Sequence, residues 1–194
     1  MEEANSIRIA VGLGNPGAQY EGTRHNAGFS FVERIAEEQG IAPKAWKKKG
    51  LSLVTEVRIA GRPLLLAKPQ TFMNLSGNAV LSLMAETRAK PPQFLVICDD
   101  ALFDAGKVRI RPSGSHGGQN GLRSIVDAIG SLFPRIRLGV GLCPPEKELS
   151  SHVLSRFLPE ERERFQHLLE ESTEMVNTIL SEGLTAAMNR WNGA

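Results

Sequence analysis

The 194-residue chain has only two cysteines, Cys98 and Cys143, and no run of apolar residues long enough to cross a membrane. Two cysteines so far apart are too few for a disulfide framework and lack the close spacing of a metal-binding knuckle. The first ten residues carry two acids and no long apolar stretch, so they do not resemble a signal peptide. We therefore expect a cytoplasmic protein without a membrane segment.

Two kinds of catalytic site are also missing from the sequence. A serine hydrolase with a strand–turn–helix elbow needs Gly-x-Ser-x-Gly, and neither Ser76 nor Ser115 has a glycine two residues before it. A zinc site needs clustered ligands, whereas His116, His152 and His167 are scattered along the chain. These absences predict that the protein holds no metal.

The composition that remains is ordinary for a globular protein, with 41% hydrophobic and 23% charged residues. The length predicts a single domain with its own core over residues 1–194. The net charge is only +2, but basic residues gather between 44 and 49 and again between 107 and 137. A local basic footprint is enough for a nucleic-acid binder, although the lysine run at 44–49 is more simply a solvated surface.

Patterns typical of strands and of helices alternate along the chain. The strand-like runs are 7–12, 51–59, 63–67, 94–98, 107–111 and 135–140. Apolar periodicity predicts helices over 26–39, 77–88 and 122–129, the last with Asn120 as N-cap, and one long helix from Pro159 to about residue 181. The alternation predicts an α/β fold, a three-layer sandwich in which helices flank a mixed, mostly parallel central sheet.

The stretch VGLGNPG, residues 11–17, matches the G-x-G-x-x-G pattern of dinucleotide-binding loops. Such a loop also needs a helix that opens within the motif and an acid at a strand end about 20 residues later. Gly22 and Thr23 disfavour an early helix, and Glu37 and Glu38 fall late in the next predicted helix. The context argues against a nucleotide-dependent oxidoreductase and indicates that the glycines shape a tight exit from the first strand.

Polar side chains occupy four of the predicted loops at strand ends. They are Asn15 and His25, Asn74, Asp99, and Asn120. Because the carboxyl ends of parallel strands meet at one edge of a sheet, we expect these groups to converge. A neutral imidazole can activate water to attack an ester, a carboxylate can fix its tautomer, and asparagine amides can stabilise the oxyanion.

The segments that carry these residues are VGLGNPGAQYEGTRHNAGF, KPQTFMNLSGNAV, DDALFDAGKVRIRPSGSHGGQNGLRSI and RIRLGVG. In order and spacing they resemble bacterial-type peptidyl-tRNA hydrolases over nearly the whole chain. The resemblance implies hydrolysis of the ester between a peptide and the 3′ ribose of tRNA. It also implies a monomeric α/β enzyme without metal or cofactor, whose partner is the acceptor end and 3′ CCA of peptidyl-tRNA.

The resemblance further implies a role for each matched residue. His25 would be the general base, Asp99 would orient it, and Asn15 would position the substrate carbonyl. The positions matched to substrate and tRNA contacts are Asn74 and Asn120, Tyr20 and Phe72 around the 3′ end, and Arg111 and Arg137 on a phosphate.

Two positions depart from the family pattern, since Gln119 stands where a histidine is usual and Leu102 where an acid is favoured. A non-catalytic RNA-binding relative, like the plastid splicing-factor homologues, is the alternative interpretation. The presence of His25, Asp99 and three asparagines favours the enzyme. The segment 142–153 is expected to be either a flap over the site or a plain surface loop.

Overall fold

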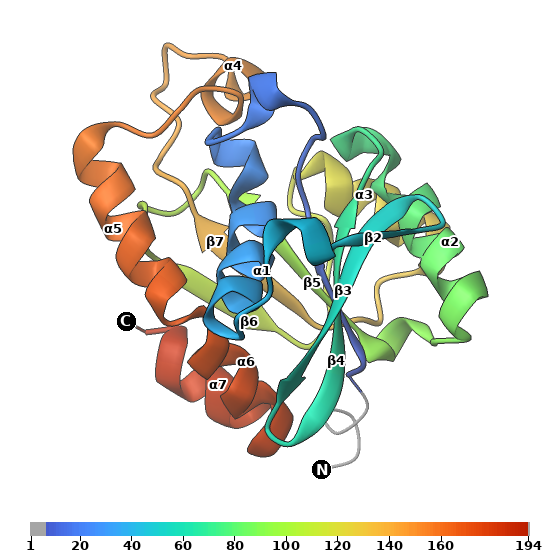
Figure 1. Ribbon diagram of the computed structural model, residues 1–194. Helices are drawn as coiled ribbons and strands as arrows, with labels where there is room; N and C mark the ends of the chain where they lie inside the picture. The colour runs from blue at the N-terminus through green and yellow to red at the C-terminus, as the bar shows by residue number, and fades with distance from the viewer. Residues whose placement is uncertain (1–6, 194) are drawn as a thin grey trace.

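The computed structural model describes residues 7–193, which form one seven-stranded sheet with helices on both faces (Figure 1). The strand order is β2-β3-β4-β1-β5-β7-β6. The strands are β1 Ile9–Gly12, β2 Lys47–Lys49, β3 Ser52–Ile59, β4 Arg62–Pro69, β5 Phe94–Asp100, β6 Val108–Arg111 and β7 Arg135–Gly139. The central strands β4, β1, β5 and β7 are parallel, and antiparallel pairs flank them at both edges. The predicted α/β sandwich with a mixed sheet is confirmed.

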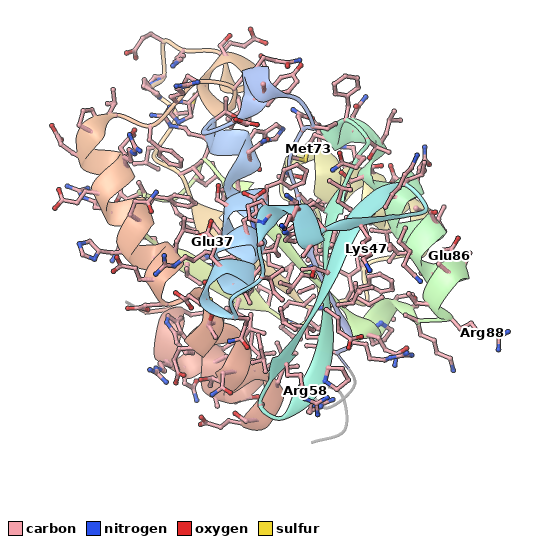
Figure 2. The ribbon with its side chains drawn as sticks, viewed as in Figure 1. Glu37, Lys47, Arg58, Met73, Glu86 and Arg88 are labelled. Carbon is pink, nitrogen blue, oxygen red and sulfur yellow. The ribbon has the colours of Figure 1, made fainter. Side chains whose placement is uncertain are left out.

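The helices divide between the two faces of the sheet. One face is covered by α1 Ala27–Glu38, α5 Pro159–Glu170, α6 Ser172–Ser181 and α7 Leu184–Trp191, and the other by α2 Ser76–Thr87 and α3 Asn120–Ile129 (Figure 1). Central strand β5 is buried along its whole length and alternates between two apolar cores, with Ile97 facing one and Cys98 the other. Figure 2 shows charged side chains such as Glu37 and Glu86 on the outer surfaces of the helices.

Helix α1 packs with its backbone directly against β1. A Cβ atom on Gly12 would overlap the carbonyl oxygen of Gly28, and a Cβ atom on Gly28 would overlap the backbone of Leu13 and Ile97. The close approach places the turn before α1, the short 3-10 helix η3 (Arg24–Asn26), above the ends of β1 and β5. The glycines of the first motif therefore shape the strand exit, as predicted.

Some predicted boundaries are wrong. The long helix expected from Pro159 to 181 is two helices that meet at Glu171, whose carboxylate accepts a hydrogen bond from Trp191 Nε1 on α7 at 2.8 Å. The apolar stripe runs on through the break, so periodicity does not reveal it. The lysine run forms the edge strand β2, in which Lys47 and Lys48 are exposed. Helix α7 and the short helix α4 (Leu149–Val153) were not predicted.

The first six residues, on which the expectation about a signal peptide depends, lie outside the described residues. Within residues 7–193, no helix combines the length and the apolar character needed to cross a membrane.

Candidate functional site

The candidate site is a pocket of about 760 Å³ beside the carboxyl ends of the parallel strands. Seven of the predicted site residues line it, among them Asn15 and His25 after β1, Asn74 after β4, and Asp99 at the end of β5. Asn120 at the start of α3 also lines it. The expectation that these polar groups converge is therefore confirmed.

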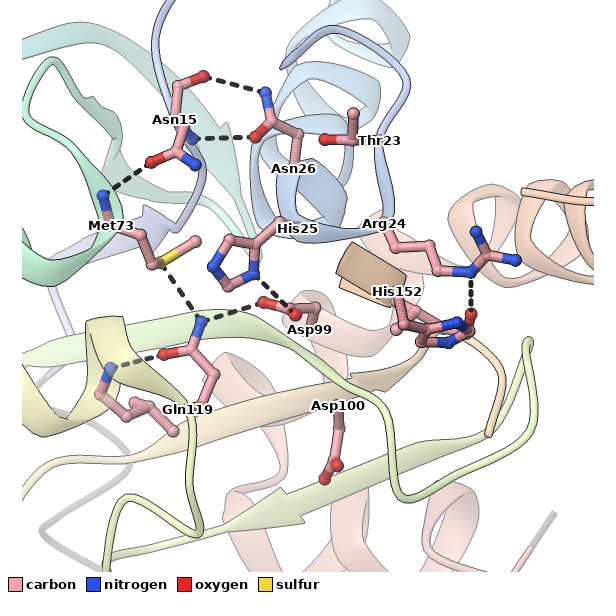
Figure 3. Close-up of polar contacts among 12 residues, drawn as sticks. Asn15, Thr23, Arg24, His25, Asn26, Met73, Asp99, Asp100, Gln119 and His152 are labelled. Carbon is pink, nitrogen blue, oxygen red and sulfur yellow. Dashed lines mark hydrogen bonds and ion pairs between the residues drawn. The ribbon is translucent and has the colours of Figure 1, made fainter. Parts of the chain in front are cut away.

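His25 and Asp99 form a buried pair (Figure 3). His25 Nδ1 lies 2.8 Å from Asp99 Oδ2, and the two residues are 9% and 2% exposed. Because a carboxylate accepts, the hydrogen sits on Nδ1 and leaves Nε2 as the acceptor nitrogen of a neutral ring. No residue within 7–193 makes a hydrogen bond to that Nε2. The geometry is that of a general base held by a carboxylate.

Asn15 is held by a reciprocal contact with Asn26. The Asn15 N–H donates to Asn26 Oδ1 at 2.8 Å, and Asn26 Nδ2 donates to the Asn15 carbonyl at 3.0 Å. Asn15 Oδ1 accepts from the Met73 N–H at 2.7 Å, so the amide Nδ2 is the group left to face a substrate. Asn26 thus supports the site, a role that was not predicted for it; its place next to His25 in a loop rich in polar side chains was the signal.

Gln119 contacts the second oxygen of Asp99. Its Nε2 donates to Asp99 Oδ1 at 2.9 Å, and its Oε1 accepts from the Leu122 N–H at 2.7 Å (Figure 3). Gln119 is therefore the N-cap of α3, and the prediction that Asn120 caps this helix is wrong. Asn120 is instead the first helical residue, which leaves its exposed side chain at the pocket.

The loop that carries Gln119 reaches the site by an unexpected route. Strand β6 runs antiparallel to β7, so Arg111 lies at the end of the strand that is remote from the pocket, opposite Arg135. The loop 112–119 must double back along the sheet to bring Gln119 to Asp99. Buried Arg135 anchors this loop by donating to the carbonyls of Gly114 and Ser115.

Asp100 points to a different partner from its neighbour Asp99. Its Oδ2 lies 2.7 Å from Arg137 Nε, and its Oδ1 accepts from the Leu102 N–H at 3.0 Å. Burial raises the pKa of Asp100 above its ordinary value, against the lowering effects of the Leu102 N–H and of Arg137. Burial also raises the pKa of the Cys98 thiol, which fits a buried small apolar residue and not a nucleophile.

The predicted tRNA contacts form two groups, and one residue of each, Phe72 or Arg137, lines the pocket. Tyr20 and Phe72 meet edge to face, with ring centroids 6.4 Å apart, and Phe72 is 55% exposed at the pocket wall. Arg137 lines the pocket while paired with Asp100, whereas Arg111 is exposed and does not line it. The structure therefore brings Arg137 to the site and leaves Arg111 on the outer strand.

The segment 142–153 borders the site and is fastened beside it. Arg24 donates from Nε to the Val140 carbonyl at 3.0 Å and from Nη1 to Ser155 Oγ at 2.7 Å, and it pairs with Glu161 on α5. Leu149 and Val153 of α4 line the pocket. These contacts hold the chain on either side of the segment, and α4 forms part of the pocket wall.

No group of three or more His, Cys, Asp or Glu side chains suited to hold a metal ion occurs among residues 7–193. Asp99 and Asp100 are each engaged by nitrogen donors, as described above.

Comparison with known proteins identifies the family. The family model described as peptidyl-tRNA hydrolase matches residues 9–194. The peptidyl-tRNA hydrolases of Trichlorobacter lovleyi and Chloroflexus aggregans are 43% and 45% identical, over 95% of this chain and 94% and 98% of theirs. The crystal structure of peptidyl-tRNA hydrolase from Acinetobacter baumannii is 35% identical, covers 97% of this chain and 95% of that one, and superposes with a TM-score of 0.89. The chain belongs to the peptidyl-tRNA hydrolase family.

Proposed function

We propose that the chain hydrolyses the ester between a peptide, or an N-blocked amino acid, and the 3′ ribose of tRNA, with His25 as general base and Asp99 as its support. The peptidyl-tRNA hydrolase family, to which the chain belongs, is named after this reaction. The observation that carries the assignment is the buried His25–Asp99 pair, which presents an acceptor nitrogen to the pocket. The same pair and the pocket around it favour an enzyme over a non-catalytic RNA-binding relative.

The proposed reaction needs only water and these side chains. His25 Nε2 takes a proton from a water molecule while the water oxygen attacks the ester carbonyl carbon. Asp99 stabilises the imidazolium that forms, since its carboxylate lies 2.8 Å from Nδ1. As the bond from carbon to the 3′ oxygen breaks, the imidazolium returns the proton to the ribose. The products are the free peptide and tRNA.

The asparagines supply the donors for the charge that develops on the carbonyl oxygen. Asn15 Nδ2 is suited to this because its Oδ1 is already held by the Met73 N–H. Asn74 and Asn120 also line the pocket and hold the substrate in this proposal. A preorganised donor of this kind contributes about 3–4 kcal/mol to transition-state stabilisation in a serine protease.

The tRNA end binds around the pocket in the same proposal. Tyr20 and the exposed ring of Phe72 stack with the bases of the 3′ end, and Arg111 and Arg137 contact a phosphate of the acceptor arm. We further propose that the protein acts as a monomer in the cytoplasm, where ribosomes generate its substrate.

Release of tRNA from an N-acetyl-aminoacyl-tRNA tests the proposal. The wild type should release tRNA, and His25→Ala should lower kcat by about 100-fold or more, the usual contribution of a general base, while tRNA binding is retained. His167→Ala is the matched control, because His167 is an exposed residue of α5 paired only with Glu170.

Two results would contradict the proposal. A wild type that binds tRNA and releases none is a binding protein and not a hydrolase. A His25→Ala variant with nearly the full rate would show that another group removes the proton.

A further inference from the structure

The Asp99 carboxylate has two donors among residues 7–193, one on each oxygen. His25 Nδ1 meets Oδ2 at 2.8 Å and Gln119 Nε2 meets Oδ1 at 2.9 Å. We propose that Gln119 is a positioning residue of the hydrolytic reaction, whose amide holds the Asp99 carboxylate in line with His25 independently of pH. This inference rests on the proposed function of the His25–Asp99 pair.

The surroundings of Gln119 allow only one orientation of its amide. The Leu122 N–H, 2.7 Å away, needs an acceptor, so the oxygen lies there. Asp99 needs a donor, so the nitrogen lies on that side, where it also contacts Met73 Sδ at 3.2 Å. The residue is 8% exposed, which keeps water from substituting for these contacts. Gln119 therefore couples the start of α3 rigidly to the end of β5.

The contact matters because Asp99 is buried. A carboxylate that is 2% exposed and loses one of two donors keeps a buried, partly unsatisfied charge and becomes free to turn about its Cβ–Cγ bond. Such a turn would move Oδ2 away from His25 Nδ1. The other charged groups of this region are engaged elsewhere, Asp100 with Arg137 and Arg24 with Glu161.

Because residue 119 is a glutamine, its contact with Asp99 does not change with pH. A primary amide neither gains nor loses a proton in the working range of an enzyme, so its N–H reaches Asp99 at every pH. A titratable side chain at this place would change its charge beside the pair and thereby alter the balance between neutral and protonated His25. Two other histidines have partners of their own: His152 on α4 contacts the Gly141 carbonyl at 3.0 Å, and His116 Nδ1 accepts from the Gly118 N–H at 3.1 Å.

Two substitutions separate this role from helix capping. Serine is a strong N-cap but is too short to reach Asp99, so Gln119→Ser keeps the cap and removes the donor. Glutamate has the size of glutamine and can still accept from the Leu122 N–H, so Gln119→Glu keeps the cap and places a second carboxylate against Asp99. Thermal unfolding of both variants reports whether the cap and the fold are retained.

Both variants should lower kcat more than they change KM. For Gln119→Ser we expect a loss of about ten-fold in kcat, the effect of removing one hydrogen bond to a charged group. For Gln119→Glu, the added negative charge should also move the acid limb of the kcat/KM profile to higher pH by about half a unit or more. NMR titration of the His25 ring should shift in the same direction.

Wild-type kcat and an unchanged pH profile in both folded variants would overturn the inference and leave Gln119 as a helix cap alone. An unchanged His25 titration in Gln119→Glu would overturn it as well. Because the NMR titration requires no turnover, it tests the role of Gln119 even if wild-type protein releases no tRNA, a result that would contradict only the proposed function.

Discussion

At the scale of residues, two adjacent carboxylates at the end of β5 have separate partners. Successive side chains of a strand point to opposite faces, so Asp99 meets His25 while Asp100 meets Arg137 on the neighbouring strand β7. The sequence shows two acids in a row but not which partner each takes, because the partners come from residues 25 and 137. The first acid serves the proposed reaction, and the second anchors a basic residue at the pocket wall.

Asp100 should make the stability of the protein decrease as the pH rises. Burial raises its pKa above the value of about 3.8 in the unfolded chain, so the folded state holds this proton more tightly. The stability that this contributes is fully present below the unfolded pKa and is lost as the pH rises through the folded pKa. Asp100→Asn removes this dependence. Urea unfolding at several pH values should show the variant gaining stability relative to wild type as the pH rises.

Asp104→Asn is the matched control, because Asp104 is an exposed acid in the turn that follows β5. Its stability difference from wild type should stay nearly constant with pH. If the difference for Asp100→Asn were equally flat, burial would not govern the protonation of Asp100 in the folded protein.

At the scale of elements, the position of His25 depends on how closely α1 packs on β1. Gly28→Ala should destabilise the fold, because the added methyl group meets the backbone of Leu13 and Ile97, which cannot turn aside as a flexible side chain could. Overpacking of this kind costs about 1–3 kcal/mol in the free energy of unfolding, more than the helix propensity gained from alanine. Chemical denaturation measures the loss.

Gly193→Ala serves as the control, since a Cβ atom there meets nothing within 4 Å. A Gly28→Ala variant as stable as wild type would mean that α1 can move away from the sheet. Its kcat would then report how much displacement of His25 the reaction tolerates.

The elements with regular apolar patterns were predictable from sequence, and those fixed by tertiary contacts were not. Helix α1 and strand β5 fall within two residues of their predicted bounds, because periodicity and an unbroken apolar run are local signals. The break at Glu171 and the strand Lys47–Lys49 have no such signal. The break at Glu171 is stabilised by the hydrogen bond from Trp191. The strand Lys47–Lys49 forms by pairing with β3 at the edge of the sheet.

At the scale of the whole molecule, the candidate site joins segments that are far apart in sequence. The convergence of His25, Asp99 and the asparagines followed from the α/β pattern and the family motifs. The role of Gln119 as N-cap and its contact with Asp99 did not, since they depend on β6 turning antiparallel and on the loop 112–119 doubling back. The partner of Arg137 depends likewise on β7 lying beside β5.

Arg111 and Arg137 should contribute to the salt dependence of tRNA binding. Arg111→Ala and Arg137→Ala should each weaken binding and reduce the slope of log K against log salt by about 0.7–0.9, the value for one phosphate contact. Arg137→Ala should also lower stability, because it leaves the buried Asp100 carboxylate without its cation. Filter binding at several salt concentrations measures both slopes.

Arg58→Ala is the control for this measurement, because Arg58 lies on β3 and bonds to the nearby Gly61 carbonyl, away from the pocket (Figure 2). Unchanged slopes for both Arg111→Ala and Arg137→Ala would place the tRNA footprint elsewhere, for instance on the lysines of β2.

The strand order has a consequence for the enzyme during its own synthesis. Strand β7, which comes late in the chain, lies between β5 and β6, and α4, which comes later still, lines the pocket. A growing copy of this protein is itself a peptide esterified to tRNA, the kind of molecule that the finished enzyme is proposed to cleave. Because Leu149, Ser150, Val153 and Leu154 line the pocket, it cannot be completed until these residues have left the ribosome, so a shorter growing copy lacks a complete site.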